Sequence, residues 1–230
     1  SDGMSVMTGR ERALLALNHQ EPDRVPYQPL FTDPLAERAL VSPYLGVTDS
    51  VTWQGLMTDS PGTKRRELEF MDADIAWVHN RLRMQAKIVN EDEEAYTQVW
   101  ESGLVARVHK NPYYWEPLDF PIKDEKDLDR MVFPDLEDPA RRAGLREEIA
   151  FLKAQGYFVT GFTGYYLFQD FLGWRALEEF MVDLIKHKEF AHEMLKRTHQ
   201  FNMRQAEILI EAGVDCVGIA DDLGHGHGLM

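Results

Sequence analysis

The chain has 230 residues, of which 44% are hydrophobic, and a formal net charge of -14 from 39 acidic and 25 basic side chains. This hydrophobic content supports a buried core and excludes global disorder, while the acidic excess would repel a polyphosphate backbone, so nucleic acid is not an expected partner. The single Cys216 excludes an internal disulfide framework. No apolar run reaches the about 18 residues of a membrane span, and we expect a cytoplasmic protein without a membrane partner.

The first predicted element is a short amphipathic helix. Thr8 and Glu11 have the spacing of a capping box, and an apolar face then runs to about Asn18. Pro22 ends this helix. Residues 24–31 (RVPYQPLF) predict a short strand with a proline near each end, which suits a barrel strand near its rim.

Strands and helices then alternate along the chain. Three further strands are expected at 72–79, 157–162 and 214–220. Helices are expected over 139–155, 173–185 and 189–212. Alternation of apolar and polar residues around a Glu-Ser-Gly turn predicts an inserted β-hairpin at about 95–108.

This order implies right-handed βαβ units and a parallel sheet. We therefore expect an α/β fold: a partial TIM (β/α) barrel with about four parallel strands and their helices, plus the inserted β-hairpin. Residues 1–3, ahead of Met4, are interpreted as an expression scar, and residues 4–230 as a single incomplete barrel domain.

Candidate site residues follow from this fold, because barrel enzymes carry their reactive groups on loops at the C-terminal ends of strands. The candidate catalytic residues are Asp221 and Asp222. The candidate substrate-binding residues are Gln28, Asp33, His79, Arg81, Arg83, Tyr165, Tyr166 and Gln169. Successive strand residues point to opposite faces, so one aspartate of the pair should line the barrel mouth while the other is structural.

Two groups of these candidates have a plainer alternative. Arg81 and Arg83 would bind a substrate carboxylate through both of its oxygens, although paired arginines after a strand are as often solvated surface. His225 and His227 could hold zinc or iron together with Asp222. A mobile glycine-rich loop is the plainer interpretation of this short histidine motif.

Several stretches, in order, resemble the uroporphyrinogen decarboxylase superfamily, which also contains the corrinoid-linked methyltransferases. They are residues 7–26 (MTGRERALLALNHQEPDRVP), 116–118 with 133–135, 164–173 before 176–179, and 211–215 before 220–224. The resemblance spans the chain after residue 3. It implies a TIM barrel, of which this sequence would match the N-terminal half.

The resemblance also provides a test for each branch. Decarboxylases of the superfamily carry Arg-x-Ala-Gly-Arg after the first strand and a catalytic Asp after the second. Here residues 31–38 read FTDPLAER, and no Phe-Ser-Asp occurs around 77–81. Methyltransferases hold zinc through His-x-Cys and a later Cys; those ligands are absent from this sequence, since Cys216 has no His two residues before it.

The leading hypothesis is a fragment of a corrinoid-linked methyltransferase-like enzyme that acts on a small molecule. Zinc would be held only by the full-length parent, and a corrinoid protein would be its partner. Two alternatives remain: a tetrapyrrole decarboxylase of porphyrin biosynthesis, and a non-catalytic half-barrel module that forms homo-oligomers through its open edge. We expect the chain alone to be inactive, because four parallel strands do not close a barrel.

Overall fold

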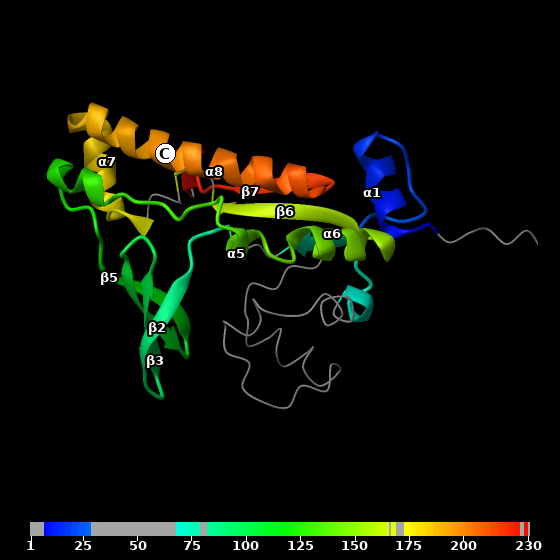
Figure 1. The fold of residues 1–230 in the computed structure, drawn as a ribbon, viewed down its shortest axis with the longest axis horizontal. Helices are drawn as coiled ribbons and strands as arrows, with labels where there is room; N and C mark the ends of the chain where they lie inside the picture. Colours follow the sequence, from blue (N-terminus) through cyan, green and yellow to red (C-terminus); the bar gives the residue numbers. More distant parts are fainter. Residues whose placement is uncertain are drawn as a thin grey trace, which may run out of the picture. The chain divides into compact units, whose positions relative to one another are not determined.

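The computed structural model describes residues 7–28, 68–78, 82–165, 167–168, 173–225 and 228–229 (Figure 1). The chain forms two compact units. Unit 1 combines residues 1–79, 143–162 and 209–217, and unit 2 combines residues 80–142, 163–208 and 218–230.

A three-stranded parallel sheet has the strand order β1-β6-β7. Its members are β1 (Ile75–Val78), β6 (Phe158–Tyr165) and β7 (Cys216–Ala220). In the register of the first pair, Ile75 lies opposite Phe158 and Val78 opposite Gly161. The strands expected at 72–79, 157–162 and 214–220 are therefore confirmed.

Helix α1 (Gly9–Leu17) begins with the predicted capping box. The Glu11 backbone N–H donates to Thr8 Oγ1 at 3.2 Å, and the Thr8 N–H donates to Glu11 Oε2 at 2.8 Å. A Cβ on Gly9 would lie 2.6 Å from the Asp74 Cα, so only glycine lets the helix start approach the start of β1 this closely.

The strand predicted at 24–31 is wrong for its described part, because residues 24–28 form no strand. The Tyr27 carbonyl accepts from the N–H groups of Asp74 and Ile75, at 2.8 and 3.2 Å. The Tyr27 N–H, however, donates to the Asp74 carboxylate at 2.8 Å. Pro26 has no N–H to extend a ladder, and a side chain takes the place of a backbone acceptor. Residues 29–31 lie outside the described part of the chain.

The helix predicted over 139–155 is in fact two helices, α5 (Pro139–Arg142) and α6 (Leu145–Ala154). Gly144 separates them, because its φ of +77° is left-handed and does not continue a helix.

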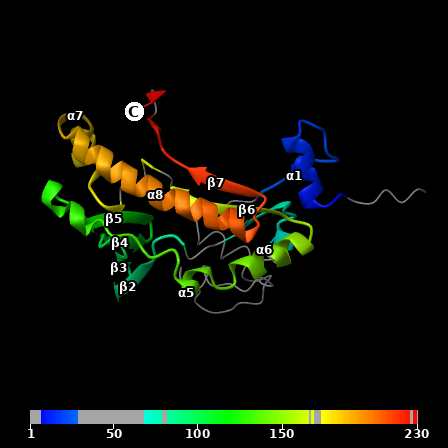
Figure 2. The ribbon, with the colours of Figure 1, turned by 45° about the horizontal axis from the view of Figure 1, so that its top comes forward.

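The helices that precede β7 are α7 (Leu177–Lys186) and α8 (Lys188–Ala212). A Cβ on Gly161 would lie 2.8 Å from Leu209 Cδ2, so the last turn of α8 packs directly on β6 (Figure 2).

Unit 2 contains an antiparallel sheet of order β2-β3-β4-β5. Its strands are β2 (Ala86–Glu91), β3 (Ala95–Trp100), β4 (Val105–Lys110) and β5 (Tyr113–Asp119). The predicted hairpin at 95–108 is present as the β3–β4 pair, but it is the centre of a larger sheet. Ala106 and Val108 are buried, whereas all of β5 is exposed.

The core of unit 2 lies around Trp174 and Phe180, both fully buried. Met194 and Ile122 pack in the same cluster. The remaining elements are a 3-10 helix, η1 (Glu125–Arg130), and a short antiparallel pair, β8 (Gly224–His225) with β9 (Gly228–Leu229). None of the helices within the described residues is both long enough and apolar enough to cross a bilayer.

Candidate binding site at the C-terminal ends of the parallel strands

The segments that follow the parallel strands all belong to unit 2. We call the described residues 82–85, 164–165, 167–168 and 221–224 the C-terminal edge; they lie after β1, at and just beyond the end of β6, and after β7. Loops in this position carry the reactive groups of parallel α/β enzymes.

Arg83 lies against the end of β6. A Cβ on Gly164 would be 2.5 Å from Arg83 Nε and 2.7 Å from its Cζ, and Gly164 has a φ of +98°. Both the space and the backbone conformation therefore require glycine at this position. The arginine that follows β1 is thereby packed onto the backbone of the neighbouring strand.

The backbone around Arg83 is tied to the antiparallel sheet. Gln85 Nε2 donates to the Arg83 carbonyl at 2.8 Å, and the Gln85 N–H donates to Glu101 Oε2 at 2.8 Å. Glu101, which follows β3, also forms an ion pair with Arg141. These contacts fix the segment on which Arg83 stands.

The two predicted catalytic carboxylates differ in their surroundings. Asp221 Oδ2 accepts hydrogen bonds from the N–H groups of Leu167 and Phe168, at 3.0 and 2.8 Å. Asp221 is half-buried, whereas Asp222 is exposed. Because β7 ends at Ala220, both residues lie beyond the strand, and the alternation of strand side chains does not apply to them.

Three of the predicted residues, Arg83, Asp221 and Asp222, thus belong to the C-terminal edge. Gln28 is half-buried and belongs to unit 1. The other predictions fall where the structure describes no side chain: Asp33, His79, Arg81, Tyr165, Tyr166, Gln169, His225 and His227.

The described residues do not fit a metal centre. They contain no group of three His, Cys, Asp or Glu side chains that could hold an ion. Cys216 is exposed, and Val214 stands two residues before it, where a zinc motif of the methyltransferase kind has histidine. The predicted metal site at His225 and His227 involves side chains outside the described set.

A cavity of about 470 Å³ lies elsewhere in unit 2, between η1 and the α7–α8 junction. Its walls mix Glu125, Glu189 and Glu193 with two lysines, next to the apolar Leu128 and Phe190. Gln28 and Arg83, the two predicted substrate-binding residues with described side chains, do not line this cavity.

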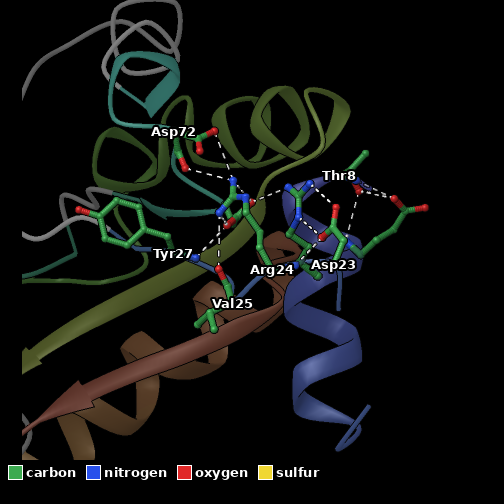
Figure 3. Close-up of polar contacts among 9 residues, drawn as sticks. Thr8, Asp23, Arg24, Val25, Tyr27 and Asp72 are labelled. Atoms are coloured by element: carbon green, nitrogen blue, oxygen red, sulfur yellow. Dashed lines mark hydrogen bonds and ion pairs between the residues drawn. The ribbon is translucent and has the colours of Figure 1, made fainter. Parts of the chain in front are cut away.

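A charge cluster at the start of β1 was not predicted from the sequence (Figure 3). Asp74 is 1% exposed. Its carboxylate accepts from Arg12 Nη1 at 3.0 Å and from Arg24 Nη1 at 2.6 Å. Arg12 also pairs with Asp23 at 2.5 Å, a hydrogen bond that lowers the pKa of Asp23 and raises that of Arg12.

A second aspartate, Asp215, lies directly before β7, and its side chain is only 5% exposed. It accepts from Arg10 Nη2 at 2.8 Å, from Lys153 Nζ at 2.9 Å and from the Val159 N–H at 3.0 Å. Burial acts to raise the pKa of Asp215, but these hydrogen bonds outweigh it and the pKa lies below its ordinary value. Arginines of α1 thus hold aspartates at the N-terminal ends of two parallel strands.

No protein-family model matches the chain, and neither does any curated protein. Among solved structures, the chain is similar to a methyltransferase from Methanosarcina mazei, with a TM-score of 0.59 and 17% sequence identity. The match covers 94% of this chain and 60% of that protein, so the chain spans less than two thirds of its length. At this identity, the likeness shows a methyltransferase-like fold and no more.

Proposed function

We propose that the chain forms part of a TIM-barrel enzyme of the uroporphyrinogen decarboxylase superfamily, in its corrinoid-linked methyltransferase branch. The observation that carries the proposal is the fold likeness to a methyltransferase over 94% of this chain. The ordered motifs that resemble the superfamily support the same assignment. The partner in this proposal is a corrinoid protein, and the substrate is a small molecule.

The C-terminal edge is the proposed binding surface. Arg83 would bind an anionic group of the ligand, because a guanidinium donates two parallel hydrogen bonds to a carboxylate or phosphate. Its packing against Gly164 restricts the side chain before the ligand arrives, which lowers the entropy lost on binding. The exposed Asp222 would provide a hydrogen-bond acceptor at the same edge.

Tetrapyrrole decarboxylation is the second candidate, and Arg83 is the observation that favours it. A substrate with many carboxylates needs cations to hold it, and Arg83 is one cation at the proposed binding surface. The acidic segment FTDPLAER at 31–38, in place of a motif with two arginines, is the argument against it.

A binding experiment separates the two candidates, because both ligands are coloured. The purified chain is titrated with methylcobalamin, which carries a phosphodiester, and in parallel with uroporphyrin, which carries eight carboxylates. We expect a saturable change in the methylcobalamin spectrum that uroporphyrin does not compete away. The Arg83→Gln variant should bind methylcobalamin about tenfold more weakly, through loss of a charge-assisted hydrogen bond.

Arg107→Gln is the matched control, since Arg107 pairs with Asp92 on the antiparallel sheet. It should bind methylcobalamin as the unmodified chain does. The decarboxylase would be favoured if the chain bound uroporphyrin in a way that depends on Arg83 and did not bind methylcobalamin. If neither compound binds, the proposed function is wrong.

A further inference from the structure

We infer that Asp221 is a positioning residue, which holds the start of the β6–α7 loop through backbone hydrogen bonds and thereby influences ligand affinity without touching the ligand. The part concerning the ligand rests on the function proposed above. The part concerning the loop rests on the geometry of Asp221 alone.

One carboxylate oxygen makes both contacts. Asp221 Oδ2 accepts from the Leu167 N–H at 3.0 Å and from the Phe168 N–H at 2.8 Å. Because β6 ends at Tyr165, these two N–H groups lie beyond the strand, and the carboxylate is their acceptor. Half-buried N–H groups that lose their acceptor destabilise the conformation that buries them.

The side chain of Phe168 fixes the same segment from a second direction. Its ring packs edge-on to Phe180, with the ring centroids 6.3 Å apart, against the core cluster that includes Trp174. The backbone is thus held by the residue that follows β7, while the side chain is held by the core of unit 2. Leu167 and Phe168 cannot shift without breaking one of the two attachments.

Along the chain, this attachment follows shortly after the residue that contacts the proposed anion-binding group. Gly164, against which Arg83 packs, is three residues before Leu167. The contact between Asp221 and the loop therefore helps to set where β6 ends and where the Arg83 guanidinium lies. A residue that acts in this way influences ligand affinity without touching the ligand.

Asp222 differs from its neighbour in being exposed. If both carboxylates touched the ligand, removal of either charge would have the same effect. If Asp221 acts through the loop, an uncharged acceptor should replace it, because the amides need an oxygen rather than a charge. This difference makes the assignment testable.

The experiment compares Asp221→Ala and Asp221→Asn in the full chain. Hydrogen exchange of the Leu167 and Phe168 amides and methylcobalamin affinity are measured together, with urea unfolding as a check that each variant is folded. Asp221→Ala should speed exchange at both amides about ten- to hundredfold, as expected for loss of hydrogen bonds to a charged group, and should weaken binding. Asp221→Asn keeps one oxygen and should restore most of both properties.

Asp92→Ala is the matched control. Asp92 Oδ1 also accepts from two backbone N–H groups, those of Glu94 and Ala95, at 2.9 and 2.8 Å, but in the turn between β2 and β3. This variant should leave both the exchange at Leu167 and Phe168 and the affinity unchanged. If loss of any such aspartate loosened the whole chain, exchange at Leu167 and Phe168 would speed up in Asp92→Ala as well as in Asp221→Ala.

Two results would overturn the inference. The first is unchanged amide exchange in Asp221→Ala. The second is an affinity for Asp221→Asn as low as that of Asp221→Ala, because ligand binding would then depend on the charge of Asp221 rather than on its hydrogen bonds to the loop. If the unmodified chain does not bind methylcobalamin, the proposed function fails, and the exchange result alone then decides the role of Asp221.

Discussion

Aspartate and arginine side chains lie at both ends of the parallel strands, but their surroundings differ between the two ends. At the N-terminal ends, in unit 1, the side chains of Asp74 and Asp215 are buried, and each accepts from an arginine of α1 and from further donors. At the C-terminal ends, in unit 2, Asp222 is exposed and Arg83 is half-buried. Burial and partners, rather than residue type, separate a stabilising ion pair from a candidate binding group.

The largest expected effect comes from Asp74. Asp74→Ala leaves Arg12 and Arg24 without their buried partner and should lower the free energy of unfolding by about 3–5 kcal/mol, as is usual when one member of a buried ion pair is removed. Urea unfolding measures the loss.

Asp72→Asn provides the control from the same cluster, because asparagine removes the charge and also tolerates the left-handed backbone of residue 72, whose φ is +51°. Asp72 pairs with Arg24 at 3.3 Å, but its side chain is 86% exposed, so the loss should be at most about 1 kcal/mol. Similar losses in the two variants would contradict the distinction between buried and exposed pairs.

The next effect concerns two glycines with nearly equal φ. Gly164 and Gly213 have φ values of +98° and +100°, but only Gly164 faces a side chain, that of Arg83. Both alanine variants should lose about 1–2 kcal/mol of stability from the left-handed backbone conformation.

Ligand affinity should separate these two variants. Gly164→Ala displaces the Arg83 guanidinium and should weaken methylcobalamin binding about tenfold, while Gly213→Ala should not change it. Isothermal titration of both variants provides the comparison. Equal affinities would mean that the position of Arg83 does not matter for binding.

A smaller effect follows from the low pKa values of Asp215 and Asp23. A carboxyl whose pKa is lower in the folded state stabilises the fold above its unfolded pKa, and this contribution is lost as the pH falls through the folded value. The stability of the chain should therefore decrease below about pH 4. Asp215→Asn should lower stability at neutral pH and make the acid slope shallower; an unchanged slope would contradict this assignment.

The smallest effect is expected for Arg83→Gln on stability. Arg83 is half-buried at a loop, so the free energy of unfolding should change by less than about 0.5 kcal/mol, even though ligand affinity falls. Thermal unfolding without ligand measures this change. A loss comparable to that of Asp74→Ala would make Arg83 a structural residue.

The sequence predicted the elements whose pattern reflects burial. Strands β1, β6 and β7 and the capped helix α1 follow from apolar runs and from the Thr8–Glu11 spacing. Strand β5 was missed because all of its residues are exposed and Pro117 interrupts it, so it lacks the alternation that a buried face produces.

The same limit applies to the sites. The C-terminal edge could be located from the sequence, because residues after parallel strands are brought to one edge by the topology. Arg12 and Asp74 are 62 residues apart in the sequence, so no local pattern predicts their pairing. An arginine on a capped helix and an aspartate directly before a strand were the available signals, and each of them is common.

Backbone NMR tests most directly the claim that the C-terminal edge binds the ligand. On titration of the labelled chain with methylcobalamin, the amide signals of the C-terminal edge, including residues 82–85, should shift, while those of α1 and of residues 74–76 should remain in place. Shifts that gather instead at α1, at the start of β1 or on the antiparallel sheet would contradict the account.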